Sequence, residues 1–366
     1  MSVAPVPQTT PAESRRARVM VVDDSVVVRG LVARWLEESG DFDVVATAAN
    51  GRIAVEALSR VEPDLVVLDI EMPEMDGLTA LPLLLRRKPN LKVLIVSTLT
   101  HRNAEISLRC LSLGALDYVA KPDGHRQVTT STMFRQDLLK RLKALAGSRA
   151  RSARPPLRVA APSSPALKPS AHRPQCLVIG ASTGGPRAVE EVLVGMGSVL
   201  QRIPVLVVQH MPPMFTGVFA DHLRVQLGVR ACEPEHGEPL VPGTVYIAPG
   251  GRHMGLAMGQ GAPVVRLDDG PPVNFCRPAV DVLFRDAACV FKASALAVVL
   301  TGMGSDGTQG ARLLCEAGAT VIAQDEATST VWGMPGSIVK AGLAQAILPL
   351  ESIGPALKGH ITGLTS

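Results

Sequence analysis

Short apolar runs recur along the first third of the chain, and each is followed by polar residues and then by an amphipathic stretch. Five such runs are Val19–Val22, Phe42–Thr47, Leu65–Leu68, Val93–Val96 and Ala115–Ala120. Runs of this length are typical of buried strands, and the stretches between them have the period of helices. Strands that alternate with helices predict a parallel sheet covered on both faces. We therefore predict an α/β domain of the (βα)5 type over residues 17–146.

A second series of alternating strands and helices begins at Cys176. Apolar runs predict strands at Cys176–Ile179, Val205–Val208, Leu296–Leu300 and Thr320–Ala323. Between residues 229 and 267, shorter runs separated by Pro-Gly and Gly-Gly predict short strands and hairpins. A last helix is expected after Gly336. The second domain, residues 175–366, is thus predicted to be a doubly wound α/β domain with a β-rich insertion.

The segment between the two series has no apolar periodicity. Residues 147–174 alternate proline with serine, alanine and arginine, a composition that keeps a chain extended and builds no core. We expect a linker there that lets the two domains reorient. Residues 1–17 are rich in proline, threonine and serine and are expected to be disordered.

Composition narrows the classes of function. Aromatic residues make up 3% of the chain and the net charge of +4 falls largely in the linker, so no nucleic-acid-binding face is expected. The cysteines show no C-x-x-C spacing, which argues against a zinc site or a disulfide framework. No apolar run has the length of a membrane span, and the N-terminus lacks a signal peptide pattern. We expect a cytoplasmic protein that does not insert into a membrane.

Polar residues follow the predicted strands of the first domain. In a parallel sheet the carboxyl ends of the strands lie along one edge, where ligands gather. Carboxylates that converge on one edge repel one another unless a cation lies among them, and oxygen ligands suit Mg²⁺. A lysine beside them is suited to hold a phosphoryl oxygen. A helix cap explains one such aspartate, but not the whole set: Asp23, Asp24, Asp69, Ser97 and Lys121.

The same residues lie in motifs that resemble the receiver domain of two-component response regulators. The motifs are Val-Val-Asp-Asp-Ser, Leu-Asp-Ile-Glu-Met-Pro-Glu-Met-Asp-Gly and Tyr-Val-Ala-Lys-Pro. The resemblance implies that a histidine kinase phosphorylates Asp69, and that Asp69 binds Mg²⁺ with the two aspartates after the first strand. It also implies that Lys121 contacts the acyl phosphate and that Ser97, or its neighbour Thr98, is the switch hydroxyl.

The first strand of the second domain leads into a glycine-rich turn with a serine at its tip. Residues 180–184, Gly-Ala-Ser-Thr-Gly, match the pattern G-x-S-x-G, and Pro186 suits the first turn of the helix that follows. Strand, tight turn and helix are the context in which this pattern exposes a nucleophilic serine. A serine helix cap is the structural alternative. A P-loop is disfavoured because no Gly-Lys-Ser/Thr sequence ends the turn.

A serine becomes a strong nucleophile when a base removes its proton and an acid orients that base. Ser182, His210 and Asp306 each follow a predicted apolar strand. If these strands are parallel, the three side chains lie on one edge of one sheet. Their chain order, Ser…His…Asp, differs from the Ser…Asp…His order of α/β-hydrolases.

Other histidines and aspartates of this domain are weaker candidates. His222 and His236 are expected at the surface, whereas His253 follows a Pro-Gly-Gly-Arg turn and is placed to line the site. The aspartates that compete with Asp306 are Asp281, Asp286 and Asp325.

Motifs spread through the second domain resemble the chemotaxis protein-glutamate methylesterase (CheB) family. They include Gly-Ala-Ser-Thr-Gly-Gly, Gln-His-Met-Pro, Arg-Pro-Ala-Val-Asp-Val-Leu-Phe and Leu-Thr-Gly-Met-Gly-Ser-Asp-Gly. The resemblance implies the Ser–His–Asp triad above and an oxyanion hole to which Met303, Thr183 and Gly184 contribute. It implies hydrolysis of glutamate methyl esters, and deamidation of some glutamines, on chemoreceptors. No metal or cofactor is expected in this domain, and phosphorylation of the receiver is expected to relieve inhibition.

Two alternative functions remain open at this stage. The same esterase fold is compatible with receptors of a pathway other than chemotaxis, and the sequence does not distinguish the two. A response regulator whose second domain only binds a partner is the alternative from another class. The intact Ser, His and Asp argue against that second alternative.

Overall fold

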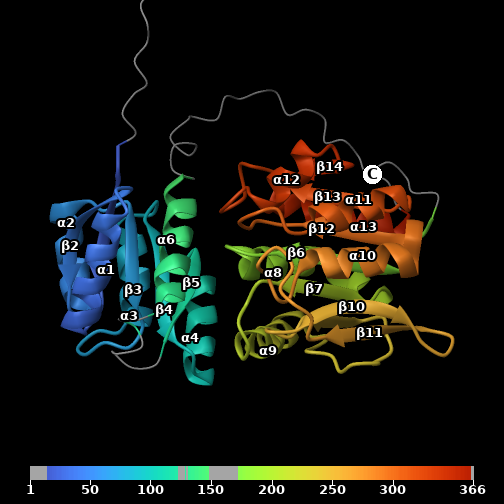
Figure 1. Ribbon diagram of the computed structural model, residues 1–366, viewed down its shortest axis with the longest axis horizontal. Coiled ribbons are helices and arrows are strands. Elements are labelled where there is room, and N and C mark those ends of the chain that lie inside the picture. Colours follow the sequence, from blue (N-terminus) through green and yellow to red (C-terminus); the bar gives the residue numbers. More distant parts are fainter. Residues whose placement is uncertain (1–14, 123–127, 129–130, 148–171, 364–366) are drawn as a thin grey trace, which may run out of the picture.

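The computed structural model describes residues 15–122, 128, 131–147 and 172–363. Figure 1 shows two α/β units side by side, the N-terminal unit in blue to teal and the C-terminal unit in green to red. Most of the predicted linker and of the N-terminal segment lies outside the described residues. None of the described helices is both long enough and apolar enough to cross a membrane.

The N-terminal unit is a five-stranded, fully parallel sheet of order β2-β1-β3-β4-β5, which confirms the predicted (βα)5 fold. Its strands are β1 (Ala17–Val22), β2 (Phe42–Ala48), β3 (Leu65–Asp69), β4 (Lys92–Thr98) and β5 (Asp117–Lys121). Its helices are α1 (Val26–Glu38), α2 (Gly51–Val61), α3 (Gly77–Arg87), α4 (His101–Ser112) and α6 (Thr132–Gly147).

Side-chain caps fix where four of these helices begin. Ser25, Asn50, Asp76 and Thr100 each precede a helix and accept a hydrogen bond from a backbone N–H of its first turn. These bonds satisfy donors that the helix itself leaves unpaired. Because each cap follows closely on a strand end, the loops at this edge of the sheet are short and the polar residues there are held close together.

The C-terminal unit is built on a seven-stranded sheet of order β14-β13-β12-β6-β7-β9-β8, and every pairing in it is parallel. Its strands are β6 (Cys176–Ala181), β7 (Val205–Gln209), β8 (Arg230–Cys232), β9 (Thr244–Ile247), β12 (Ala295–Val299), β13 (Thr320–Gln324) and β14 (Ala346–Leu348). Its helices are α8 (Gly185–Met196), α9 (Phe215–Leu227), α10 (Val280–Phe291), α11 (Thr308–Glu316), α12 (Met334–Lys340) and α13 (Leu350–Thr362), with short 3₁₀ turns η1 (Gly197–Arg202) and η2 (Lys292–Ser294).

Two details of this unit differ from the expectation. Within the segment predicted as an insertion, only β10 (His253–Met258) and β11 (Pro263–Asp268) form a separate antiparallel pair, whereas β8 and β9 extend the main sheet. The helix expected after Gly336 begins earlier, as α12 at Met334, and it is not the last one, because β14 and α13 come after it. The sequence pattern of these last two elements is weak, because β14 has only three residues and α13 contains a proline, Pro355.

The two units pack against each other through apolar residues. Helix α4 of the N-terminal unit contacts α8 and α9 of the C-terminal unit (Figure 1). The rings of Tyr118 on β5 and Phe215 on α9 are stacked, with centroids 4.5 Å apart and an interplanar angle of 1°. A single cluster of buried apolar side chains therefore continues from one unit into the other.

Candidate functional site

Three neighbouring strands of the seven-stranded sheet bring the predicted triad together. Ser182 follows β6, His210 follows β7, and Asp306 lies in the loop after β12; β6 pairs with both of the other strands. The backbone N–H of His210 donates to the carbonyl of Ala181 at 3.1 Å, and that of Ser182 donates to the carbonyl of Thr301 at 3.0 Å. The prediction that one sheet edge carries all three residues is confirmed.

The turn that carries Ser182 depends on its glycines. Gly184 has a φ of +74°, and a Cβ there would lie 2.4 Å from the hydroxyl oxygen of Thr330. The Ser182 carbonyl accepts from the Gly185 N–H at 2.7 Å and from Gln209 Nε2 at 2.9 Å. Substituting either glycine would collide with these neighbours, so the turn holds the serine in one conformation.

His210 and Asp306 form a buried pair. Nε2 of His210 lies 2.8 Å from Oδ2 of Asp306. The carboxylate also accepts from Asn274 Nδ2 at 3.1 Å and from the backbone N–H groups of Val280, Asp281 and Gly307. Burial raises the pKa of Asp306, but the hydrogen bond and charge of His210, together with the hydrogen bonds from Val280 and Asn274, outweigh it and the pKa is lowered. Asp306 is therefore an ionised and fixed partner for the histidine.

The other ring nitrogen of His210 faces a cysteine. Cys276 Sγ lies 3.6 Å from His210 Nδ1. Burial lowers the pKa of His210, but hydrogen bonds with Asp306 and Cys276 raise it more, to about 9. Across the described part of the chain, no hydrogen bond joins Ser182 to His210. Because Nε2 is held by Asp306, Nδ1 is the nitrogen that takes a proton from Ser182 once the ring is neutral. A hydrogen bond between a catalytic serine and its base commonly tightens only with substrate present.

The backbone after β12 passes close to the serine. A Cβ on Gly302 would lie 2.7 Å from the Cβ of Ser182, and one on Gly333 would lie 3.1 Å from the Cα of Met303. Thr183 is fully buried, and its carbonyl accepts from the Thr301 hydroxyl at 2.9 Å. The predicted oxyanion residues, Thr183, Gly184 and Met303, thus belong to the two backbone segments that meet at Ser182.

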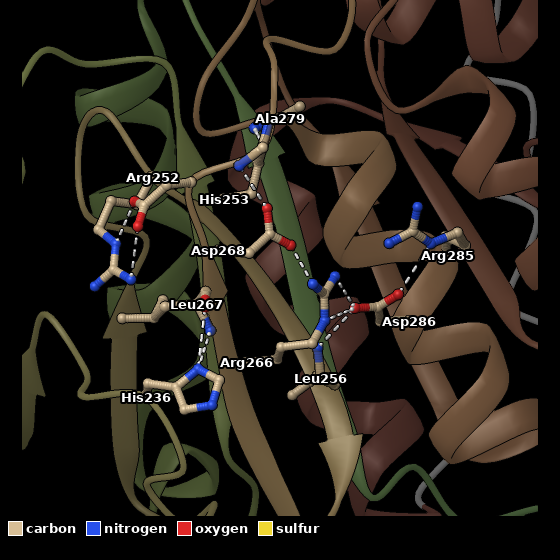
Figure 2. A network of polar contacts seen from close by, with 12 residues as sticks. His236, Arg252, His253, Leu256, Arg266, Leu267, Asp268, Ala279, Arg285 and Asp286 are labelled. Carbon is tan, nitrogen blue, oxygen red and sulfur yellow. Dashed lines mark hydrogen bonds and ion pairs between the residues drawn. The ribbon is translucent and has the colours of Figure 1, made fainter.

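The competing histidine has a structural role. His253 lies between two segments of one loop: Nε2 donates to the carbonyl of Pro271 at 3.0 Å, and Nδ1 accepts from the N–H of Ala279 at 3.2 Å. Figure 2 shows His253 beside Ala279. Both ring nitrogens are used and the side chain is buried. His253 therefore clamps the loop of residues 269–279 and does not line the site.

The competing aspartates also have other partners. Asp286 accepts from Arg266 and from the N–H of Leu256, and with Arg285 and Asp268 it ties the β10–β11 pair to α10 (Figure 2). Asp281 accepts from Gly310, and Asp325 accepts from Thr328. Among the described residues, Asp306 is the only carboxylate bonded to His210.

Sequence reasoning missed two residues beside the triad, Asn274 and Cys276. Both lie on the loop that His253 clamps, and they contact Asp306 and His210 respectively. One signal in the sequence could have identified them, because both residues come just before the motif Arg-Pro-Ala-Val-Asp. This motif leads into α10, and the first backbone N–H groups of α10 donate to Asp306.

The edge of the N-terminal sheet gathers the predicted acidic residues around a lysine. Lys121 Nζ lies 2.6 Å from Asp69 Oδ2 and 3.5 Å from Asp23 Oδ2. One carboxylate oxygen from each of Asp23, Asp24 and Asp69 lies within 4.8 Å of the others. Burial raises the pKa of Asp69 to about 6, with Lys121 opposing the rise and Asp23 adding to it. Two buried carboxylates, Asp23 and Asp69, and the exposed Asp24 are mutually repelling oxygen ligands of the kind that fits a hard divalent cation such as Mg²⁺.

The two candidate switch hydroxyls have different surroundings. Ser97 is buried and its Oγ lies 2.9 Å from Ser107 Oγ on α4. Thr98 Oγ1 accepts from Asn103 Nδ2 at 2.6 Å and is partly exposed. Both hydroxyls connect β4 to α4, which is the helix that packs against the C-terminal unit.

Comparison with known proteins matches both units. The family of response regulator receiver domains matches residues 19–132, and the CheB methylesterase family matches residues 177–357. A protein-glutamate methylesterase/protein-glutamine glutaminase of Nitrobacter hamburgensis is 51% identical, over 93% of each chain. A protein of the same name from Rhodopseudomonas palustris is 47% identical, over 99% of each chain.

Among solved structures, the catalytic domain of Thermotoga maritima CheB methylesterase is 42% identical, with a TM-score of 0.49, and covers 50% of this chain and 97% of that one. Because the two relatives above are 47% and 51% identical over 93% or more of the chain, and because a receiver is followed by a methylesterase unit, the chain belongs to the CheB methylesterase family of response regulators.

Proposed function

We propose that this protein hydrolyses glutamate methyl esters on chemoreceptors, and deamidates certain glutamines there, under the control of its receiver domain. The observation that carries the proposal is the convergence of Ser182, His210 and Asp306 on adjacent strand ends, with Asp306 already bonded to His210 at 2.8 Å. The names of the full-length relatives support this substrate class. We assign the receiver to residues 17–146, the linker to 147–174 and the methylesterase domain to 175–366.

Acyl transfer follows from the triad geometry. Ser182 Oγ attacks the ester carbonyl while Nδ1 of His210 accepts its proton, and Asp306 at Nε2 fixes the tautomer and stabilises the imidazolium. The same nitrogen then returns the proton to the departing methanol. Water attacks the acyl-enzyme by the reverse roles and releases glutamate. A carboxamide can follow the same route with ammonia as the leaving group, so one site serves both reactions.

The oxyanion that forms on the carbonyl needs fixed donors. We assign them to backbone N–H groups of the turn at Thr183 and Gly184 and of the facing segment at Met303. Each such donor contributes on the order of 3 kcal/mol to the transition state in comparable enzymes. The close packing of Gly302 against Ser182 supports this placement, since it brings the second backbone segment to the serine.

Phosphorylation of the receiver domain is proposed to control the rate of hydrolysis. Asp69 is the proposed phosphorylation site for a histidine kinase, and Asp23, Asp24 and Asp69 would hold the Mg²⁺ that neutralises charge during phosphoryl transfer. Lys121, 2.6 Å from Asp69, is placed to contact the phosphoryl group, and Ser97, with Thr98 as the alternative, is the proposed switch hydroxyl. A cytoplasmic location is proposed because both a kinase and the receptor signalling region must reach the protein.

The contact between the two domains supports inhibition by the resting receiver. Residues of α4 and of α8 and α9 line one small cavity between the domains, and Pro186 and Arg187, which begin the helix after the nucleophile turn, are among them. Val331 packs against the apolar core of the receiver, and its carbonyl accepts from the Gly302 N–H beside Ser182. The receiver thus touches the segments on both sides of the serine.

Methanol release from a methylated chemoreceptor tests the proposed nucleophile. Ser182→Ala is expected to lower the rate by roughly 10³-fold or more, because no other group replaces the attacking oxygen. Ser198→Ala is the matched control, since Ser198 is an exposed serine of the same domain. Release that is equally fast in Ser182→Ala would overturn the triad assignment.

A further inference from the structure

A fully exposed aromatic residue lies beside the catalytic histidine. Phe275 is 100% exposed, the highest value among the large apolar side chains of the described residues. It precedes Cys276, whose sulfur lies 3.6 Å from His210 Nδ1. Phe275 remains exposed with the receiver packed against the domain, so no residue that the structure describes covers it.

The backbone at this position is also unfavourable for a residue with a side chain. Val273 and Cys276 exchange two backbone hydrogen bonds, of 3.1 and 2.9 Å, around a two-residue turn. Asn274 and Phe275 within it have φ values of 53° and 64°. Turns with two left-handed residues favour Asn followed by Gly. Asn274 fits this preference, whereas Phe275 occupies the place of the glycine.

The turn is fixed to the triad on both sides. Asn274 Nδ2 donates to Asp306 Oδ1 at 3.1 Å and to Asp281 Oδ2 at 2.7 Å. Cys276 contacts His210 on the other side. The backbone of Phe275, between them, therefore has a defined position relative to the reacting groups, whereas its fully exposed ring is not held by packing.

Phe275 thus combines a left-handed backbone, which costs free energy on folding, with an apolar ring that gains none of the stabilisation that burial would give. Costs of this kind that persist at a fixed position beside reacting groups point to function rather than to folding. An aromatic ring on a fixed backbone is well suited to recognition, because it offers a large apolar surface and only two side-chain torsions have to be fixed when it is covered.

We propose that Phe275 is a specificity-determining residue that docks the protein substrate. Its ring packs on apolar side chains of the receptor surface next to the modified glutamate and so presents the ester to Ser182. The inference rests on the proposed function, since it takes the chemoreceptor as substrate. A methylated glutamate side chain is small, and contacts beyond it are what distinguish one protein ester from another.

Phe275→Gly tests the proposal in the full-length protein, with Mg²⁺ and a small-molecule phosphodonor present. Glycine suits the left-handed backbone, so the variant is expected to unfold at the same temperature as the wild type or a higher one. We expect kcat/KM for methylated receptor to fall by about tenfold or more, mainly through KM, because the lost contact is one of binding. Hydrolysis of N-acetylglutamate γ-methyl ester should stay within about twofold.

Two further variants complete the test. Phe275→Tyr should retain most of the receptor activity, and Met258→Ser, at another exposed apolar residue (62% exposed), should leave both activities unchanged. Equal losses on receptor and small ester in Phe275→Gly would mean that the turn only supports the triad, and an unchanged receptor KM would mean that the ring makes no contact; either result overturns the proposal. A wild-type enzyme that hydrolysed the small ester but not the receptor would instead overturn the receptor assignment, and the docking role with it.

Discussion

At the scale of single residues, the site depends on which nitrogen of His210 each neighbour holds. Asp306 takes Nε2, which leaves Nδ1 for the serine and for the thiol of Cys276. Both contacts favour the protonated ring, and the pKa of His210 is raised to about 9 despite burial. The ring must be neutral to accept the proton of Ser182. The resting histidine is therefore held in a charged state that the reaction has to leave.

This charge state predicts the pH dependence of the reaction. Because only neutral His210 acts as a base, kcat/KM should rise with pH up to about 9, well above the ordinary histidine value of about 6.5. Cys276→Ala removes a hydrogen bond that raises this pKa, so the midpoint should move to lower pH. Methanol release measured from pH 6 to 10 checks both expectations, with the exposed Cys289→Ala as control. A midpoint near 6.5 in the wild type would contradict the account.

At the scale of elements, the turn between β6 and α8 places strict requirements on the residues that form it. Gly184 has a left-handed φ, and a side chain there would meet Thr330. Gly228, at the end of α9, has a φ of +63° in the same left-handed region but open space around it. Alanine substitutions at these two glycines therefore distinguish two contributions to the free energy of unfolding: the strain of the left-handed backbone, and the collision of the added methyl group with a neighbour.

Gly184→Ala is expected to destabilise the domain more than Gly228→Ala does. The shared backbone cost is about 1–2 kcal/mol, and the collision with Thr330 adds to it in Gly184→Ala. Denaturant unfolding measures the difference in the free energy of unfolding, and methanol release should fall in Gly184→Ala alone. Equal destabilisation by the two substitutions would show that the turn relaxes around the added methyl group.

The elements also show what the sequence can and cannot predict. The strand ends that carry Ser182, His210 and Asp306 were predictable, because each follows a strongly apolar run. The parallel pairing of β8 and β9 and the existence of β14 were not, since strands of three or four residues have little periodicity. Asn274 and Cys276 were also missed, because they reach the triad through the fold of a loop and not through a pattern along the chain.

At the scale of the whole molecule, the two domains are joined by an apolar contact beside the active centre. The stacked rings of Tyr118 and Phe215 connect β5, which ends at Lys121, to α9, which begins five residues after His210. The phosphorylation site and the catalytic base therefore lie on elements that adjoin the same contact. A change at the receiver edge that alters β5 or α4 would loosen this packing.

Removal of residues 1–146 is expected to release the catalytic domain from this contact. The truncated protein should liberate methanol without any phosphodonor and faster than the unphosphorylated full-length chain, because the segments beside Ser182 are no longer covered. Circular dichroism of the truncated protein confirms that it is folded. A folded fragment with no gain over the unphosphorylated chain would contradict inhibition by the receiver.

The central claim is that phosphorylation of Asp69 controls hydrolysis at Ser182. Its most direct test is the rate of methanol release from methylated receptor with and without a small-molecule phosphodonor and Mg²⁺, in the wild type and in Asp69→Ala. We expect the phosphodonor to stimulate the wild type and to leave Asp69→Ala at its basal rate. Equal stimulation of both proteins, or of neither, would contradict the account.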